Sequence, residues 1–223
     1  DGSIGQPRLE DTRHLLREID VEVRNDWIAP IADSAVYQAL LGLQPSPLPQ
    51  WLERLVAASD EEPFDVVVAD EAEGYNPTHD VCRVLANLLV QRLEQSGRAV
   101  QSLEMPLVGH PCDPARNEQL QVAVSLDTRE LDYKLDIMKR YAQRCSPILE
   151  QELQTMLDTF GEQAFAQECL YSAVNTPYER NELPLTMPYF ERVGEERYRA
   201  GIYAHVIRAE HVRRLVQASG PGH

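Results

Sequence analysis

The sequence predicts an α/β protein, a three-layer Rossmann-like domain with a mostly parallel sheet. Residues 64–69 form a short β-branched run, which is typical of a strand buried on both faces of a parallel sheet. After a loop, residues 77–95 carry apolar side chains at helical spacing, so strand, loop and helix make one α/β half-unit. Because the 223 residues exceed the usual ~150 per domain by only half, we expect one domain spanning 1–223.

The elements before this unit are mainly helical. Apolar residues recur at roughly helical spacing over 9–19, and a short alternation at 21–23 predicts a strand. Two further helices are expected over 33–43 and 47–58, the second beginning at a proline, which is favoured in a first helical turn. The acidic stretch 60–63 ends this second helix before the buried strand begins.

The elements after the unit alternate between strands and helices. We expect strands over 100–108 and 120–126, separated by a Pro-rich turn at 110–114. Asp127 and Glu130 have the spacing of a capping box, which predicts a helix that ends near Cys145. The remaining expectations are a helix to about residue 160, a loop over 176–188 and a terminal helix over 203–218.

The composition is strongly acidic. Lys+Arg 21 against Asp+Glu 36 gives a net charge of −15, which argues against a general nucleic-acid or anionic-membrane binder. No apolar run approaches the ~18 residues of a membrane span. We therefore expect a soluble, cytoplasmic protein with its four cysteines reduced, and a homo-oligomer is compatible with the sequence.

The loop after the 64–69 strand is the place where chemistry is expected. In open α/β sheets, ligands bind beyond the carboxyl ends of the strands, where helix N-termini converge. Asn76 and Pro77 have the order of a helix N-cap and first helical residue, which places His79 in the first turn, facing the crevice. One interpretation is a metal ligand at His79, and the other is a capped helix start with an ordinary surface histidine.

The segment Glu73-Gly74-Tyr75-Asn76-Pro77-Thr78-His79-Asp80 resembles the Glu-Gly-(Gly/Tyr)-His-Pro-Asp-His-Asp words of the LmbE/PIG-L family of zinc-dependent de-N-acetylases. Further similar segments lie at 1–3, 103–107, 134–143 and 188–196, so the resemblance covers most of the chain. It implies a Rossmann-like fold, zinc as cofactor, His79 as a metal ligand and a catalytic role in transition-state stabilisation for Asn76.

The chain departs from the family words at three places. Asn76 and Thr78 replace a His and an Asp, and no His-Pro-Asp-Asp segment, which would supply the other zinc ligands and the general base, precedes residue 70. The resemblance therefore implies a domain that is N-terminally incomplete, with zinc binding conditional on upstream ligands. Because an amide can donate a hydrogen bond but cannot act as a general acid, Asn76 implies slower chemistry or a different substrate.

Two other sites follow from the residues alone. The turn His110-Pro111-Cys112-Asp113 repeats a His-x-x-Asp spacing and could contribute to a zinc site. Cys82 lies one turn after His79 and could act as a nucleophile, although its apolar neighbours favour a half-buried structural thiol.

The function that these observations favour is metal-dependent hydrolysis of an N-acetyl or related acyl group from an amino sugar or a similar small amide. The partner is then a small molecule. The alternative is a catalytically silent relative that binds a glycan or a protein through the same crevice. The presence or absence of the upstream metal-binding words discriminates between the two.

Overall fold

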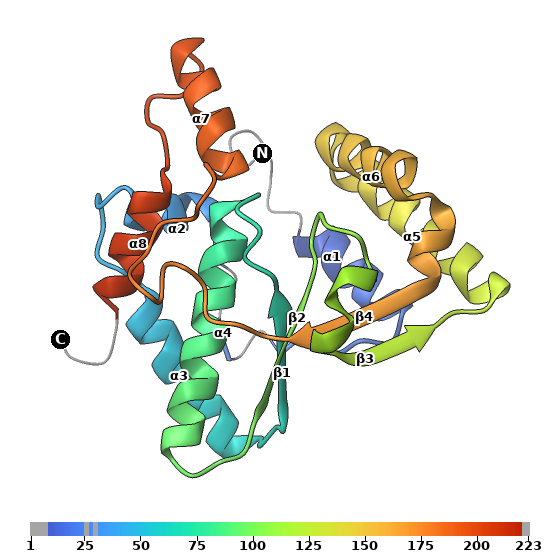
Figure 1. The fold of residues 1–223 in the computed structure, drawn as a ribbon, viewed down its shortest axis with the longest axis horizontal. Helices are drawn as coiled ribbons and strands as arrows, with labels where there is room; N and C mark the ends of the chain where they lie inside the picture. Colours follow the sequence, from blue (N-terminus) through green and yellow to red (C-terminus); the bar gives the residue numbers. More distant parts are fainter. Residues whose placement is uncertain (1–8, 25–26, 29–30, 220–223) are drawn as a thin grey trace. The chain divides into compact units, whose positions relative to one another are not determined.

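The computed structural model describes residues 9–24, 27–28 and 31–219, and the resemblance at residues 1–3 lies outside this part of the chain. The chain divides into two units, Asp1–Asp26 with Val108–Tyr171, and Trp27–Leu107 with Ser172–His223. Each combines helices with a pair of strands (Figure 1), so the α/β class is confirmed. The expected single domain over 1–223 stays a prediction.

The second unit contains the expected half-unit with nearly the expected bounds. Strand β1 (Val66–Asp70) is followed by helix α4 (Pro77–Gln95) and then by β2 (Gln101–Met105). The two strands are parallel, with Val66 opposite Gln101 and Asp70 opposite Met105. Their carboxyl ends therefore lie side by side, as the half-unit requires.

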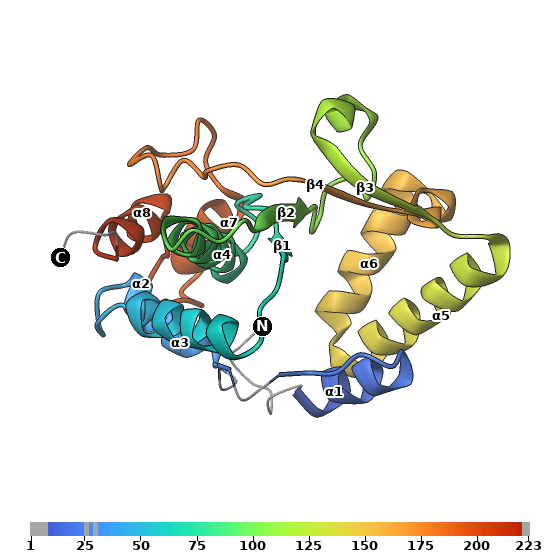
Figure 2. The ribbon, with the colours of Figure 1, turned by 90° about the horizontal axis from the view of Figure 1, so that it is seen from below.

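Helix α4 forms the centre of the packing in this unit. It lies against α2 (Asp33–Leu40), α3 (Leu48–Glu61) and α8 (Ala209–Gln217), as Figure 2 shows in end-on view. The main core consists of fully buried aliphatic side chains from these four helices, among them Leu40, Val84 and Val212. Burying several such side chains, each contributing about 1.5–3 kcal/mol, fixes the position of α4 in the unit.

Strand β1 corrects one expectation. Val66 and Val68 are each 44% exposed, so the strand is not buried on both faces. Only the alternate residue Val67 packs towards the core, with Leu89 and Leu93 of α4. The valine run reflects β-branched propensity, because such side chains favour a pleated backbone even where one face stays open.

The first unit is built around two helices. Helices α5 (Thr128–Cys145) and α6 (Pro147–Phe160) meet at Ser146 and pack on each other, with α1 (Leu9–Glu18) against α5. The predicted capping box is present, since Asp127 accepts from the Glu130 N–H and Glu130 accepts from the Asp127 N–H. Strands β3 (Leu120–Ser125) and β4 (Gln167–Ser172) pair antiparallel, so a mostly parallel sheet is not confirmed.

Several boundaries differ from those expected. Residues 21–23 form no strand, and Val21 and Val23 are exposed. The terminal helix begins at Ala209 rather than near 203, whereas α7 (Tyr189–Arg199) and β4 were not expected. Short 3-10 helices occupy Pro114–Gln119 and Glu162–Ala166. Among the described residues, no helix has both the length and the apolar character needed to cross a membrane.

Candidate active site at the end of strand β1

Asp70 and His79 form a polar pair where β1 ends and α4 begins. Oδ2 of Asp70 lies 2.5 Å from Nδ1 of His79. The His79 side chain is 37% exposed and that of Asp70 22%, so the imidazole is held on one side and accessible on the other. With Nδ1 bonded to the carboxylate, Nε2 is the ring nitrogen left to accept a proton or to bind a ligand.

The electrostatic surroundings favour the charged imidazole. The hydrogen bond that Nδ1 donates to the Asp70 carboxylate raises the pKa of His79 above its ordinary value, against the opposing effect of burial. The negative charges of Asp70, Asp33 and Asp80 act in the same direction. His79 is therefore a stronger base than a free histidine.

Asn76 holds the start of α4. Its backbone is extended, and its side-chain Oδ1 accepts a hydrogen bond from the Thr78 N–H at 2.9 Å. Pro77 follows as the first helical residue, as the sequence predicts. The carboxamide is thus fixed by its oxygen, which serves as the helix cap, and its NH₂ group is the part that remains to donate to a ligand.

The Asp80 carboxylate connects the loop 71–76 to Tyr178 through hydrogen bonds. The sequence analysis did not predict this role. The carboxylate is 1% exposed and accepts hydrogen bonds from the Gly74 N–H and the Tyr178 hydroxyl, each at 3.1 Å. Desolvation raises the pKa of Asp80 to about 6, although both hydrogen bonds favour the charged form. Gly74 has φ +66° and packs on Pro188, where a Cβ would come within 3.1 Å of the proline Cβ.

Arg83, one turn after His79, ties α4 to both strands. Its side chain is completely buried, and Nη1 donates to the Leu103 carbonyl at 2.8 Å. Nη2 donates to the Ser102 hydroxyl of β2 at 3.3 Å, and Nη1 also donates to the Ala69 carbonyl of β1 at 3.4 Å. Burial lowers the pKa of Arg83, whereas the charge of Glu104 raises it. The guanidinium therefore fixes the helix that carries His79 relative to the parallel pair.

The neighbouring acidic and thiol groups have structural explanations. Glu73 accepts a hydrogen bond from the Leu107 N–H at 2.6 Å. This bond joins the loop between β1 and α4 to the segment that follows β2. Cys82 is exposed and not half-buried as expected, and desolvation of its thiol, together with the charges of Asp70 and Asp33, raises its pKa to about 11. A thiolate nucleophile at Cys82 is therefore disfavoured near neutral pH.

The turn at 110–113, the other candidate zinc site, has its polar side chains engaged in structural contacts. Nδ1 of His110 accepts from the Cys112 N–H at 3.1 Å, Asp113 caps the following 3-10 helix, and Cys112 forms a disulfide with Cys169. The neutral His110 ring must therefore carry its proton on Nε2, which leaves no free nitrogen lone pair for a metal. The disulfide also corrects the expectation that all four cysteines are reduced.

A complete zinc site is not formed by the described residues. In the part of the chain that the structure describes, no three His, Cys, Asp or Glu side chains are grouped closely enough to hold a metal. The Asp70–His79 pair does have the arrangement in which a carboxylate orients a metal-binding imidazole. These residues thus supply one oriented ligand and not a full set.

Comparisons with protein-family models, with curated proteins and with solved structures gave no match to this chain.

Proposed function

We propose that the chain is a hydrolase that acts on a small N-acylated amine, of the amino-sugar class, at the carboxyl end of β1. The observation that supports the proposal is the 2.5 Å contact between Asp70 and an accessible His79. The resemblance to the LmbE/PIG-L words supplies the substrate class, and a three-layer Rossmann-like arrangement, a cytoplasmic location and a possible homo-oligomer belong to the same proposal.

In this proposal, Nε2 of His79 is the working atom. It can take a proton from the water that attacks the acyl carbonyl, and the resulting imidazolium is stabilised by Asp70. The proton then passes to the departing amine. The NH₂ group of Asn76 can donate to the oxyanion while Oδ1 keeps its cap bond to Thr78.

The resemblance implies a different use of the same nitrogen, in which Nε2 of His79 binds zinc and is then not available as the base. Zinc would polarise the carbonyl and activate water when bound. The described residues offer one oriented imidazole, so we assign no step to the metal. Elemental analysis of the 223-residue chain should find well below one zinc per chain. Stoichiometric zinc that is lost in His79→Ala would instead show that further residues complete the site.

The second candidate is a catalytically silent glycan- or protein-binding relative. It is favoured by one observation, which is that Asn76, at the position of the family's first histidine, caps a helix through its side chain. In that case, the crevice binds a glycan or a protein without catalysing a reaction. Substitution of Asn76 then changes only the free energy of unfolding.

The test is release of free amine from N-acetylglucosamine by the full chain. We expect kcat to fall by about 10²-fold or more in His79→Gln, since general acid–base catalysis contributes that much. The matched control is His205→Gln, which changes an exposed histidine of the same unit. Equal turnover in His79→Gln and the unmodified chain would overturn the proposed role, and no turnover in either would favour the silent relative.

A further inference from the structure

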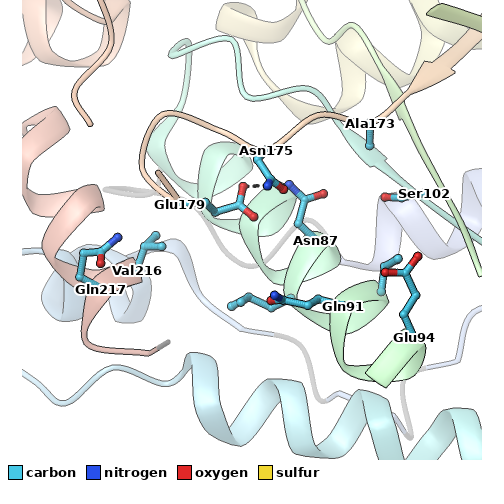
Figure 3. Close-up of a pocket in the computed structure, with 11 residues that line it drawn as sticks. Asn87, Gln91, Glu94, Ser102, Ala173, Asn175, Glu179, Val216 and Gln217 are labelled. Atoms are coloured by element: carbon cyan, nitrogen blue, oxygen red, sulfur yellow. Dashed lines mark hydrogen bonds between the residues drawn. The ribbon is translucent and has the colours of Figure 1, made fainter. Parts of the chain in front are cut away.

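A separate cavity of about 470 Å³ lies beside the second half of α4, in the unit Trp27–Leu107 with Ser172–His223. Its walls come from α4, the start of β2, the segment 173–179 and α8 (Figure 3). His79 lies eight residues before Asn87, the first lining residue on α4, so the near end of the cavity is about 12 Å from His79 along the helix. The cavity is therefore independent of the Asp70–His79 pair.

The lining of this cavity consists of hydrogen-bonding and acidic groups beside a few aliphatic ones. It includes four side-chain amides, the carboxylates of Glu94 and Glu179, and the hydroxyl of Ser102. Of the described residues, no lysine, arginine or histidine lines it. In a chain of net charge −15, such a surface attracts cations and repels anions.

The side chain of Asn87 is held in place by hydrogen bonds and presents an oxygen acceptor to the cavity. The residue is only 8% exposed, and its NH₂ group donates to the Val174 carbonyl at 3.2 Å and to Oε2 of Glu179 at 2.9 Å. Both bonds use the nitrogen, which fixes the orientation of the amide and directs Oδ1 to the other side (Figure 3). The described residues give no donor to this oxygen, and it is not an enclosed atom, so a ligand or water in the cavity can reach it.

The two carboxylates lie at different ends of this wall. Oε2 of Glu179 accepts from Asn87 and from the Thr176 N–H at 2.7 Å, which holds the carboxylate beside Asn87. Glu94 lies seven residues after Asn87, two turns along the same face of α4 and about 10 Å away. Figure 3 shows Gln91 between them. The wall thus presents acceptors at both ends of an elongated site.

The buried Arg83 guanidinium lies behind one wall of the cavity, where its positive charge could offset the acidic lining. It reaches the Ser102 oxygen at 3.3 Å but is not part of the lining, and the charges of Glu104 and Glu179 face it. Its N–H occupies an acceptor position on Ser102, so the Ser102 hydroxyl proton is the part available to the cavity. The surface that a ligand meets remains acidic.

We propose that this cavity binds a short aliphatic diamine, or a polyamine that contains one. One ammonium group donates to Glu179 and to Oδ1 of Asn87, and the other donates to Glu94. The methylene groups between them lie against aliphatic side chains of the lining, Leu88 and Val216. An ammonium group has three donors and no acceptor, which matches walls that offer carboxylate and carbonyl oxygens.

The experiment is calorimetric titration of the full chain with butane-1,4-diamine. We expect saturable binding that weakens at least ~10-fold in Glu94→Gln, because one charged acceptor is lost. The exposed Glu94 can be changed without touching the bonds of Asn87, and its fold is checked by tryptophan fluorescence. The matched control is Glu61→Gln, which removes the same charge from an exposed position of α3 and should leave the affinity unchanged.

Butane-1,4-diol provides the second control, since it has the same length without the charges and should not bind. The proposal is overturned by an absence of saturable diamine binding, by equal binding of the diol, or by equal weakening in Glu61→Gln. The last result would mean that the diamine responds to net charge and not to the cavity.

Discussion

Replacing Asp80 by Asn should remove a large part of the pH dependence of stability in the second unit. Folding raises the pKa of Asp80 from its ordinary value of 3.8 to about 6, because the carboxylate is 1% exposed. The folded chain therefore binds more protons than the unfolded chain between these two values, and stability falls as pH rises through them. At about 1.4 kcal/mol per pKa unit, the whole Asp80 contribution is about 3 kcal/mol, of which about 2.5 kcal/mol is lost between pH 4 and pH 7.

The variant Asp80→Asn keeps the shape and the contacts of this site. The amide oxygen can accept from the Gly74 N–H, and the amide NH₂ can donate to the Tyr178 hydroxyl in place of the present bond. Both tryptophans, Trp27 and Trp51, belong to the same unit, so their fluorescence in urea reports its unfolding. Asp132→Asn, at an exposed position of α5, serves as the control.

The expected result is a difference in unfolding free energy, variant minus unmodified chain, that increases by about 2.5 kcal/mol from pH 4 to pH 7. In Asp132→Asn this difference should stay flat. Parallel curves for the chain and Asp80→Asn would refute the reasoning, since they would mean that Asp80 ionises in the folded state at its ordinary pKa.

Three further changes have defined outcomes. Reducing the Cys112–Cys169 disulfide opens a loop across 57 residues and should cost about 4 kcal/mol of unfolding free energy, measured in urea with and without reductant; no change on reduction would contradict the pairing. Asn76→Ala should lose about 1 kcal/mol through the missing cap and Asn76→Asp almost none; if Asn76→Asp also keeps full turnover, Asn76 has only a capping role. Arg83→Met should cost about 1–3 kcal/mol by leaving the Leu103 carbonyl unpaired, against little change in the exposed Arg54→Met, and equal effects would show that Arg83 contributes no buried hydrogen bond.

Local signals in the sequence were sufficient for the elements that carry the site. The Asn76–Pro77 order fixed the start of α4, and the Asp127–Glu130 spacing fixed that of α5, because both are hydrogen-bonded patterns closed within four residues. By contrast, β4 was missed because its apolar stretch, 169–171, is only three residues long and shows no alternation, and its pairing with β3 is set by the fold.

The candidate site was predictable only in part. Sequence placed His79 in the first turn of α4, yet its direct contact with Asp70 depends on where β1 ends relative to the helix. The Asp80–Tyr178 bond joins residues 98 positions apart, and no local pattern specifies it. The same holds for the disulfide, since four unclustered cysteines give no spacing from which a pairing follows.

The most direct test of the site is the NMR titration of the His79 ring in the unmodified chain and in Asp70→Asn. The account predicts a His79 pKa above its ordinary value of 6.5 in the unmodified chain, because the Asp70 carboxylate stabilises the protonated ring at 2.5 Å. It predicts a clear fall in Asp70→Asn, where that charge is gone. A His79 pKa at or below 6.5 that does not move in Asp70→Asn would contradict the account.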